Sequence, residues 1–155
     1  MSFKRCNSVG KVGEQFVQDL FIRHGLNCIP SDVKEYDLLL HYQLKQFKIE
    51  VKFDVMAYHT GNLALEYYNH KKGLPSGIFA SQADFWIYVI NEEFFKTAYL
   101  IKLDELVNFF THNTGREVKG GDRNSTMRLY PLDQILSVFT RIDALETKEL
   151  LEIFK

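Results

Sequence analysis

The chain has 155 residues, a formal net charge of −1 at pH 7 and 46% hydrophobic residues. This length suits one domain, predicted over residues 1–155, and the apolar share excludes a largely disordered protein. The near-zero net charge lacks the strong basic excess that is typical of many nucleic-acid-binding domains, although local basic patches remain compatible with it.

Cysteine spacing and hydropathy narrow the class of protein further. Cys6 and Cys28 have no CxxC spacing and no histidines at zinc-finger intervals, so we expect two reduced thiols rather than a zinc site or a disulfide framework. No run approaches the roughly 18 apolar residues of a membrane span, and the first residues lack the apolar core of a signal peptide. We therefore expect a cytoplasmic protein with no membrane association.

The chain opens with a predicted amphipathic helix. Ser8 is a candidate N-cap, the helix is expected to end near Arg23, and Gly25 is a suitable stop. Apolar residues that include Val12 and Phe16 are expected on its buried side.

Strands and helices follow in an order that predicts an α/β fold. Apolar alternation and apolar runs predict strands at 36–42, 47–53, 62–68, 84–90, 97–102 and 127–132, of which the first two form a hairpin with a loop at 43–46 and the last is an edge strand. Helices are predicted at 78–83, 104–110, 133–139 and 147–154, and a flexible loop at 111–126. This order predicts a mixed β-sheet flanked by helices.

Charged residues alternate with apolar ones along the strand at 47–53. With a loop at 43–46, Tyr42 would pair with Phe47, so that Asp37 would face Lys52 across the hairpin. Glu50 would then lie on the diagonal, and two carboxylates and one ammonium would share a patch.

Two interpretations of this patch remain open. In the first, Asp37 forms an ordinary ion pair with Lys52 on a solvated sheet face. In the second, Asp37 and Glu50 hold a divalent cation between them, since hard oxygen ligands suit Mg²⁺ or Mn²⁺. Lys52 could then orient a water and stabilise an anionic transition state, which is the chemistry of phosphodiester hydrolysis.

Asp37 followed by Glu50-Val51-Lys52 resembles the D…(D/E)xK signature of the PD-(D/E)xK, or restriction-endonuclease-like, nuclease superfamily. The resemblance implies a restriction-endonuclease-like fold, Mg²⁺ or Mn²⁺ as cofactor and DNA as substrate. It also implies that Glu14, on the helix before the signature, contributes to the metal site, and that Glu66 is a further metal ligand or an acid beside the ligands. The alternative for both residues is an ordinary surface charge, on the helix for Glu14 and on an exposed strand for Glu66. Small members of this superfamily are commonly homodimers, so a homodimer is one expected assembly.

Loops rich in basic residues are candidates for holding a polyanion beside such a site. The expected phosphate contacts are Lys71, Lys72, Arg116, Lys119 and Arg123. We expect an endonuclease that is structure-selective or weakly sequence-specific. The alternatives are a catalytically inactive nuclease-fold module that binds DNA or assembles with partners, and a metal-dependent phosphatase acting on small phosphate esters.

Overall fold

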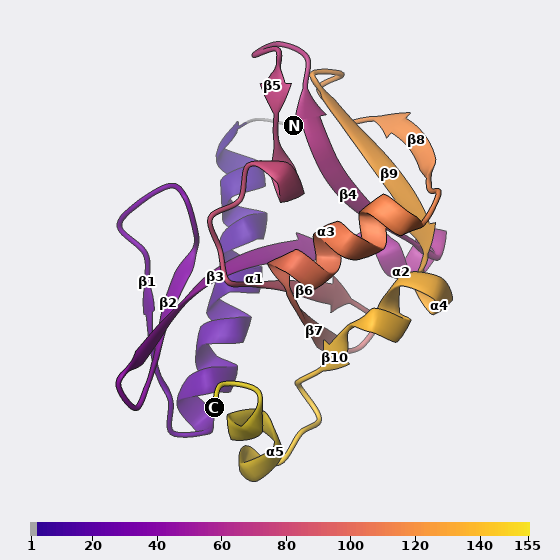
Figure 1. Ribbon diagram of the computed structural model, residues 1–155. Coiled ribbons are helices and arrows are strands. Elements are labelled where there is room, and N and C mark those ends of the chain that lie inside the picture. Colours follow the sequence, from indigo (N-terminus) through magenta and orange to yellow (C-terminus); the bar gives the residue numbers. More distant parts are fainter. Residues whose placement is uncertain (1–2) are drawn as a thin grey trace.

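The computed structural model describes residues 3–155, with side chains from Ser8 onward. Its larger sheet has six strands in the order β1-β2-β3-β6-β7-β10 (Figure 1). β3 and β6 run parallel, and the other neighbouring strands are antiparallel. The strands are β1 (Asn27–Pro30), β2 (Leu38–Tyr42), β3 (Lys45–Asp54), β6 (Phe85–Asn91), β7 (Lys96–Lys102) and β10 (Thr140–Arg141).

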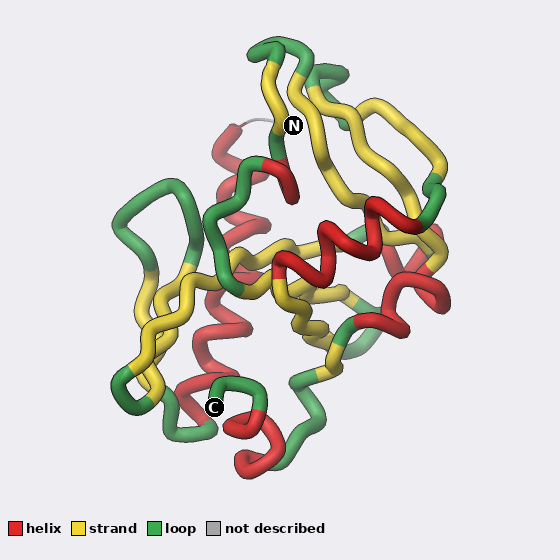
Figure 2. Tube along the Cα trace, viewed as in Figure 1, coloured by secondary structure: helices red, strands yellow, loops and turns green. Residues whose placement is uncertain are grey.

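A second sheet of four strands lies beside the larger one, in the order β5-β4-β9-β8 (Figure 2). Its strands are β4 (Asn62–Asn69), β5 (Leu74–Pro75), β8 (Arg116–Lys119) and β9 (Ser125–Pro131). Two predictions were wrong here. The segment 111–126, expected to be a flexible loop, contains β8, and the expected edge strand at 127–132 is β9, which pairs with both β4 and β8.

Helices and single turns fill the connections between strands. They are α1 (Phe3–Arg23), α2 (Ala57–Thr60), η1 (Gly77–Phe79), α3 (Leu103–His112), α4 (Leu132–Ile135), η2 (Leu136–Val138) and α5 (Thr147–Glu152). The predicted helix at 78–83 is thus only a 3₁₀ turn. Within the described residues, no helix is long and apolar enough to cross a membrane.

The first helix begins earlier than the sequence indicated. Because α1 starts at Phe3, Ser8 lies inside the helix and is not its N-cap. The predicted stop is confirmed, since α1 ends at Arg23 and Gly25 takes a left-handed conformation with φ of 79°. Val12 was wrongly placed in the core, because 46% of it is exposed.

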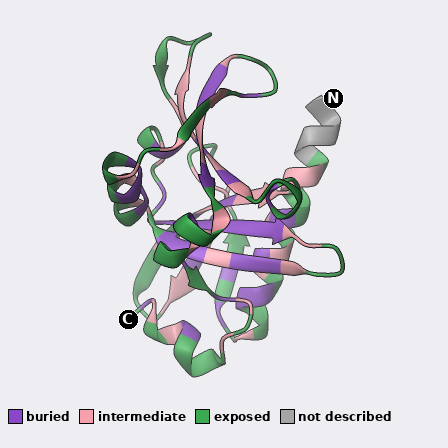
Figure 3. Cartoon of the chain, turned by 90° about the vertical axis from the view of Figure 1, so that its right-hand side faces the viewer, coloured by how far each residue is buried: buried purple, intermediate pink, exposed green. Residues whose placement is uncertain are grey.

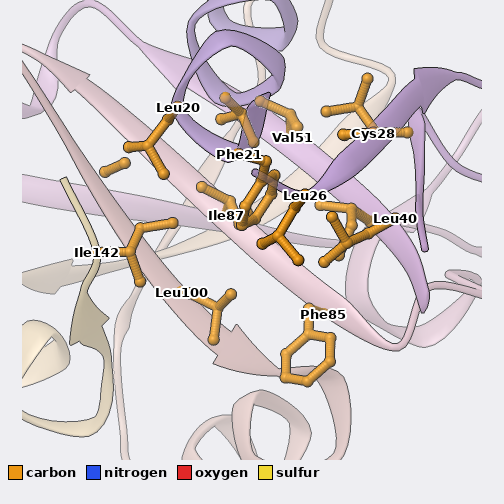
Figure 4. Close-up of a cluster of buried hydrophobic side chains, with 14 of the residues drawn as sticks. Leu20, Phe21, Leu26, Cys28, Leu40, Val51, Phe85, Ile87, Leu100 and Ile142 are labelled. Carbon is orange, nitrogen blue, oxygen red and sulfur yellow. The ribbon is translucent and has the colours of Figure 1, made fainter. Parts of the chain in front are cut away.

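The larger sheet is covered on both faces, and its central part is drawn as largely buried in Figure 3. The alternation along β6 decides which side chains enter which of the two cores. Phe85, Ile87 and Val89 of β6 pack with α1 and α5 in the first core (Figure 4). Trp86 and Tyr88 point to the opposite face, where they pack with α3 and the second sheet. The prediction of a central strand buried on both faces is confirmed, as is the mixed sheet flanked by helices.

The hairpin register differs from the predicted one by two residues. Gln43 and Leu44 alone form the turn, Tyr42 pairs with Lys45, and Leu38 pairs with Ile49. Because the side-chain period of a strand is two, this shift leaves every residue on its predicted face. Asp37 precedes this ladder, and its N–H donates to the Ile49 carbonyl oxygen, so it does not lie opposite Lys52 as predicted.

Candidate active site

Asp37, Glu50 and Lys52 lie on one patch of the β2–β3 hairpin. The Lys52 ammonium is 2.7 Å from Glu50 Oε1, and it also lies 5.2 Å from the centre of the Trp86 ring. These two contacts hold a lysine whose side chain is 43% exposed in a defined position. The predicted partner of Lys52 was Asp37, but Lys52 pairs instead with Glu50, its neighbour two residues earlier on the same face of β3.

Asp37 is held by the backbone of β3 rather than by an ion pair. Its N–H donates to the Ile49 carbonyl oxygen at 2.9 Å, and its Oδ2 accepts a hydrogen bond from the Val51 N–H at 2.8 Å. Among the described residues, no salt bridge includes Asp37. The simple Asp37–Lys52 ion pair is therefore not formed.

The pKa of the Asp37 carboxyl group is shifted by its burial and by the charges around it. Its pKa is raised to about 6, first because burial removes water from the carboxylate and second because Glu50 places a negative charge nearby. The Val51 hydrogen bond and the Lys52 charge act in the opposite direction, and Glu14 raises the pKa further. Asp37 thus lies within electrostatic reach of both other acids, which is the condition under which a cation is favoured.

Glu14 reaches this region because α1 approaches β3 very closely. A Cβ atom added at Gly13 would lie 2.7 Å from Phe53 Cβ, so only glycine permits this contact. Glu14 itself is 17% exposed and pairs with Lys11 at 2.8 Å. The glycine was not recognised from the sequence, because nothing in a helical pattern marks which glycine meets a strand.

Glu66 enters the site from the second sheet. The pairing of β4 with β9 shifts register between Glu66 and Tyr68, and such a bulge redirects side chains. Gly77 lies against this bulge with φ of 54°, and an added Cβ would be 2.0 Å from the Glu66 carbonyl oxygen. Glu66, Glu50 and Lys52 line one cleft of about 190 Å³.

The same cleft has lining residues that were not predicted from the sequence. Lys34 and Glu35, from the loop before Asp37, and Ser81, which accepts a 2.8 Å hydrogen bond from Trp86 Nε1, all face it. Lys34 and Glu35 stand in a polar loop without periodicity, so no sequence pattern marked them. Their proximity follows only from the path of the chain between β1 and β2.

The donor set fits a magnesium-type cation bound by two carboxylates. Asp37 uses Oδ2 for Val51, and Glu50 uses Oε1 for Lys52, so in the described part of the chain each keeps one oxygen without a hydrogen bond. Across those residues, no group of three His, Cys, Asp or Glu side chains is gathered closely enough to hold a metal. Mg²⁺ is commonly held by one or two carboxylates together with waters and substrate phosphate, so a pair of acids is sufficient.

The basic residues expected to contact phosphate fall into two places. The turn after β4 and the turn before β9 lie side by side, because the His70 N–H donates to the Asn124 carbonyl oxygen at 2.6 Å. Lys119 joins this pair of turns through a 2.7 Å contact with His70 Nε2. We call this end of the second sheet the basic tip, and its exposed cations are Lys71, Lys72, Lys119 and Arg123. Arg116 lies apart from it, at the other end of β8.

Comparison with known proteins bears on the fold. The structure is similar to that of a bacterial homing endonuclease, I-Ssp6803I, with a TM-score of 0.52 and 15% sequence identity over 84% of this chain and 93% of that one. No family model and no curated protein matches the sequence. The chain therefore has the fold of a known endonuclease: a mixed α/β sheet flanked by helices.

Proposed function

We propose that this protein is a Mg²⁺-dependent deoxyribonuclease of the PD-(D/E)xK type that hydrolyses phosphodiester bonds within DNA. The observation that carries the proposal is the patch on the β2–β3 hairpin, where Glu50 lies close enough to Asp37 to raise its pKa and Lys52 is held by Glu50. The similarity of the fold to that of a homing endonuclease supports the same chemistry.

Each residue of the patch has a distinct proposed role. Asp37 and Glu50 bind the cation through the oxygens that their protein hydrogen bonds leave open, and Glu14 and Glu66 complete the acidic surroundings. When bound, the cation polarises a phosphoryl oxygen and lowers the pKa of a bound water. Lys52 Nζ donates hydrogen bonds to the attacking water and to the phosphate oxygens as negative charge develops on them.

DNA is the proposed substrate because the cations of the basic tip are placed to contact backbone phosphates of a duplex at some distance from the scissile bond. β4 ends at Asn69, three residues beyond Glu66, which corresponds to roughly 10 Å at ~3.3 Å per residue, and His70 to Lys72 form the turn that follows. That length spans about three base pairs of duplex at 3.4 Å each. Lys71, Lys72, Lys119 and Arg123 would then contact phosphates on one side of the scissile bond, and Arg116 would lie outside this path.

Salt dependence of binding tests this placement. Each lost phosphate contact should reduce the slope of log K against log salt by about 1, so Lys72→Ala and Lys119→Ala should each flatten it by that amount. Lys148→Ala, on α5, is the matched control and should leave the slope unchanged. Equal slopes for all the variants would remove the basic tip from the interface.

Cleavage assays test the activity itself. Supercoiled, linear, single-stranded and four-way-junction DNA are incubated with Mg²⁺, and the wild-type protein should cut at least one of them whereas Lys52→Ala and Glu50→Gln should cut none. Lys48→Ala is the control on the same strand, since its side chain is exposed and lies over Tyr36 rather than in the patch. DNA binding without any cleavage would contradict the hydrolase proposal and leave a binding module. A homodimer would supply one site for each strand of a duplex, and sedimentation of the protein bound to DNA measures its oligomeric state.

A further inference from the structure

A second, larger cleft continues from the patch, and the proposed chemistry does not use it. Its volume is about 420 Å³, and it shares Lys52, Glu66, Gly77 and Trp86 with the smaller cleft of the candidate site. It runs toward the end of β3 and lies between the two sheets. A group bound in it would be adjacent to the bond that Lys52 is proposed to act on.

The lining of this cleft suits a flat, uncharged group better than a phosphate. Trp86 and Tyr88 form a buried aromatic floor, with 2% and 3% of their surface exposed, and Met56 and Met127 supply adaptable apolar walls. Among the lining residues the only cation is Lys52, whereas Asp54 and Glu66 are acidic. Phosphate would be repelled by these acids, but a nucleobase could bury its faces against the apolar walls.

Asp54 adds a selective hydrogen-bond acceptor. Its Oδ1 accepts from the Met56 and Ala57 N–H groups at 2.9 and 2.7 Å, which fixes the side chain at the start of α2. Within the described residues its Oδ2 has no hydrogen bond. Asp54 lines the cleft as an acceptor, so it favours a base that presents a donor there, such as the exocyclic amino group of adenine, cytosine or guanine.

We propose that this cleft receives one unpaired, amino-bearing nucleobase next to the scissile phosphate, an inference that rests on the proposed nuclease function. In an intact duplex the base is stacked and its amino group is paired, so entry requires an extruded base. Extrusion is easiest at a bulge, a mismatch or a single strand. The substrate class is therefore DNA with an unpaired base at the cleavage site.

Binding measured without metal tests this separately from cleavage. Three duplexes, identical except for a single bulged adenine, a single bulged purine that lacks the 6-amino group, or no bulge, are titrated in EDTA and followed by anisotropy. The adenine bulge should bind about tenfold more tightly than the bulge without the amino group, the difference expected for a hydrogen bond to a charged group. Because Trp86 is the only tryptophan in the chain, its emission should change with the adenine bulge.

Two variants test separately the Asp54 acceptor and the open volume of the cleft. Asp54→Asn keeps an oxygen for the α2 cap but replaces the second acceptor by a donor, so the preference for adenine should disappear or reverse. Ala64→Leu fills the cleft and should remove the preference for bulged over paired DNA, and melting temperatures show whether each variant folds. Should Asp54→Asn fail to fold, Ala64→Leu decides the question.

The two proposals fail in different ways. Equal binding of bulged and paired DNA by the wild-type protein, or an unchanged bulge preference in Ala64→Leu, would overturn the cleft inference while leaving cleavage intact. An adenine preference that survives in a folded Asp54→Asn would overturn the assignment of the acceptor. Bulge-selective binding with no cleavage of any DNA would instead overturn the nuclease proposal.

Discussion

Replacing Gly77 by alanine should damage the contact that sets the Glu66 bulge. The new Cβ would lie 2.0 Å from the Glu66 carbonyl oxygen, and the residue would keep a φ of 54°. Overpacking costs about 1–3 kcal/mol, and a left-handed backbone at a residue with a Cβ adds about 1–2 kcal/mol. We therefore expect a loss of about 3 kcal/mol in the free energy of unfolding, or roughly 6–12 °C in melting temperature for a chain of this size.

Gly73 provides the matched control for this substitution. It also has a positive φ, of 63°, but an added Cβ there would meet nothing within 4 Å. Gly73→Ala should therefore cost only the backbone part, about 1–2 kcal/mol. Urea denaturation of both variants gives the difference, which measures the clash with Glu66. If Gly77→Ala loses no more stability than Gly73→Ala, the close approach of the two segments is refuted.

Three further predictions concern the helix, the acid and the thiol. Gly13→Ala should destabilise the protein by about 1–3 kcal/mol, because the new Cβ would clash with Phe53. Gly10→Ala on the same helix has open space around the new Cβ and should stabilise the protein by about 0.5–1 kcal/mol. Denaturant unfolding of the two variants measures the difference. Because the folded pKa of Asp37 is about 6 against 3.8 unfolded, the folded state holds a proton that the unfolded state has released, so metal-free stability should fall as pH rises through this window. Asp37→Asn should lessen that fall and raise the melting temperature near neutral pH, and an unchanged pH profile would contradict this. Burial raises the pKa of the Cys28 thiol to about 12, so peptide mapping after alkylation should find Cys28 unmodified in the folded protein and modified after unfolding.

The sequence was informative where a pattern repeats locally. Alternation placed Glu50 and Lys52 on the face opposite Ile49 and Val51, and the structure agrees. The register of the hairpin was not readable in this way, because Gln43 takes the positive φ of its turn, with φ of 56°, without the glycine or asparagine that normally marks one. The patch was still found because the error was two residues, a full side-chain period.

Contacts between distant segments could not be predicted from one sequence. β4 was expected as a strand, but its partner β9 lies some 60 residues later in the chain. Local sequence patterns do not predict which distant strand will pair with it. The approach of Gly77 to Glu66 and that of Gly13 to Phe53 depend on backbones that meet only after folding. β8 was missed because its few residues are mostly polar and exposed, as those of a loop would be.

Divalent-cation binding by Asp37 and Glu50 is the claim on which the rest depends, and thermal melting with Mn²⁺ or Mg²⁺ tests it most directly. A cation that binds only the folded protein raises the melting temperature with concentration. The wild-type protein should show this rise, Glu50→Ala and Asp37→Ala should lose it, and Lys48→Ala should keep it. The account would be contradicted if neither cation changed the melting temperature of the wild-type protein. It would also be contradicted if the cation-induced rise in melting temperature persisted when Asp37 and Glu50 are both replaced.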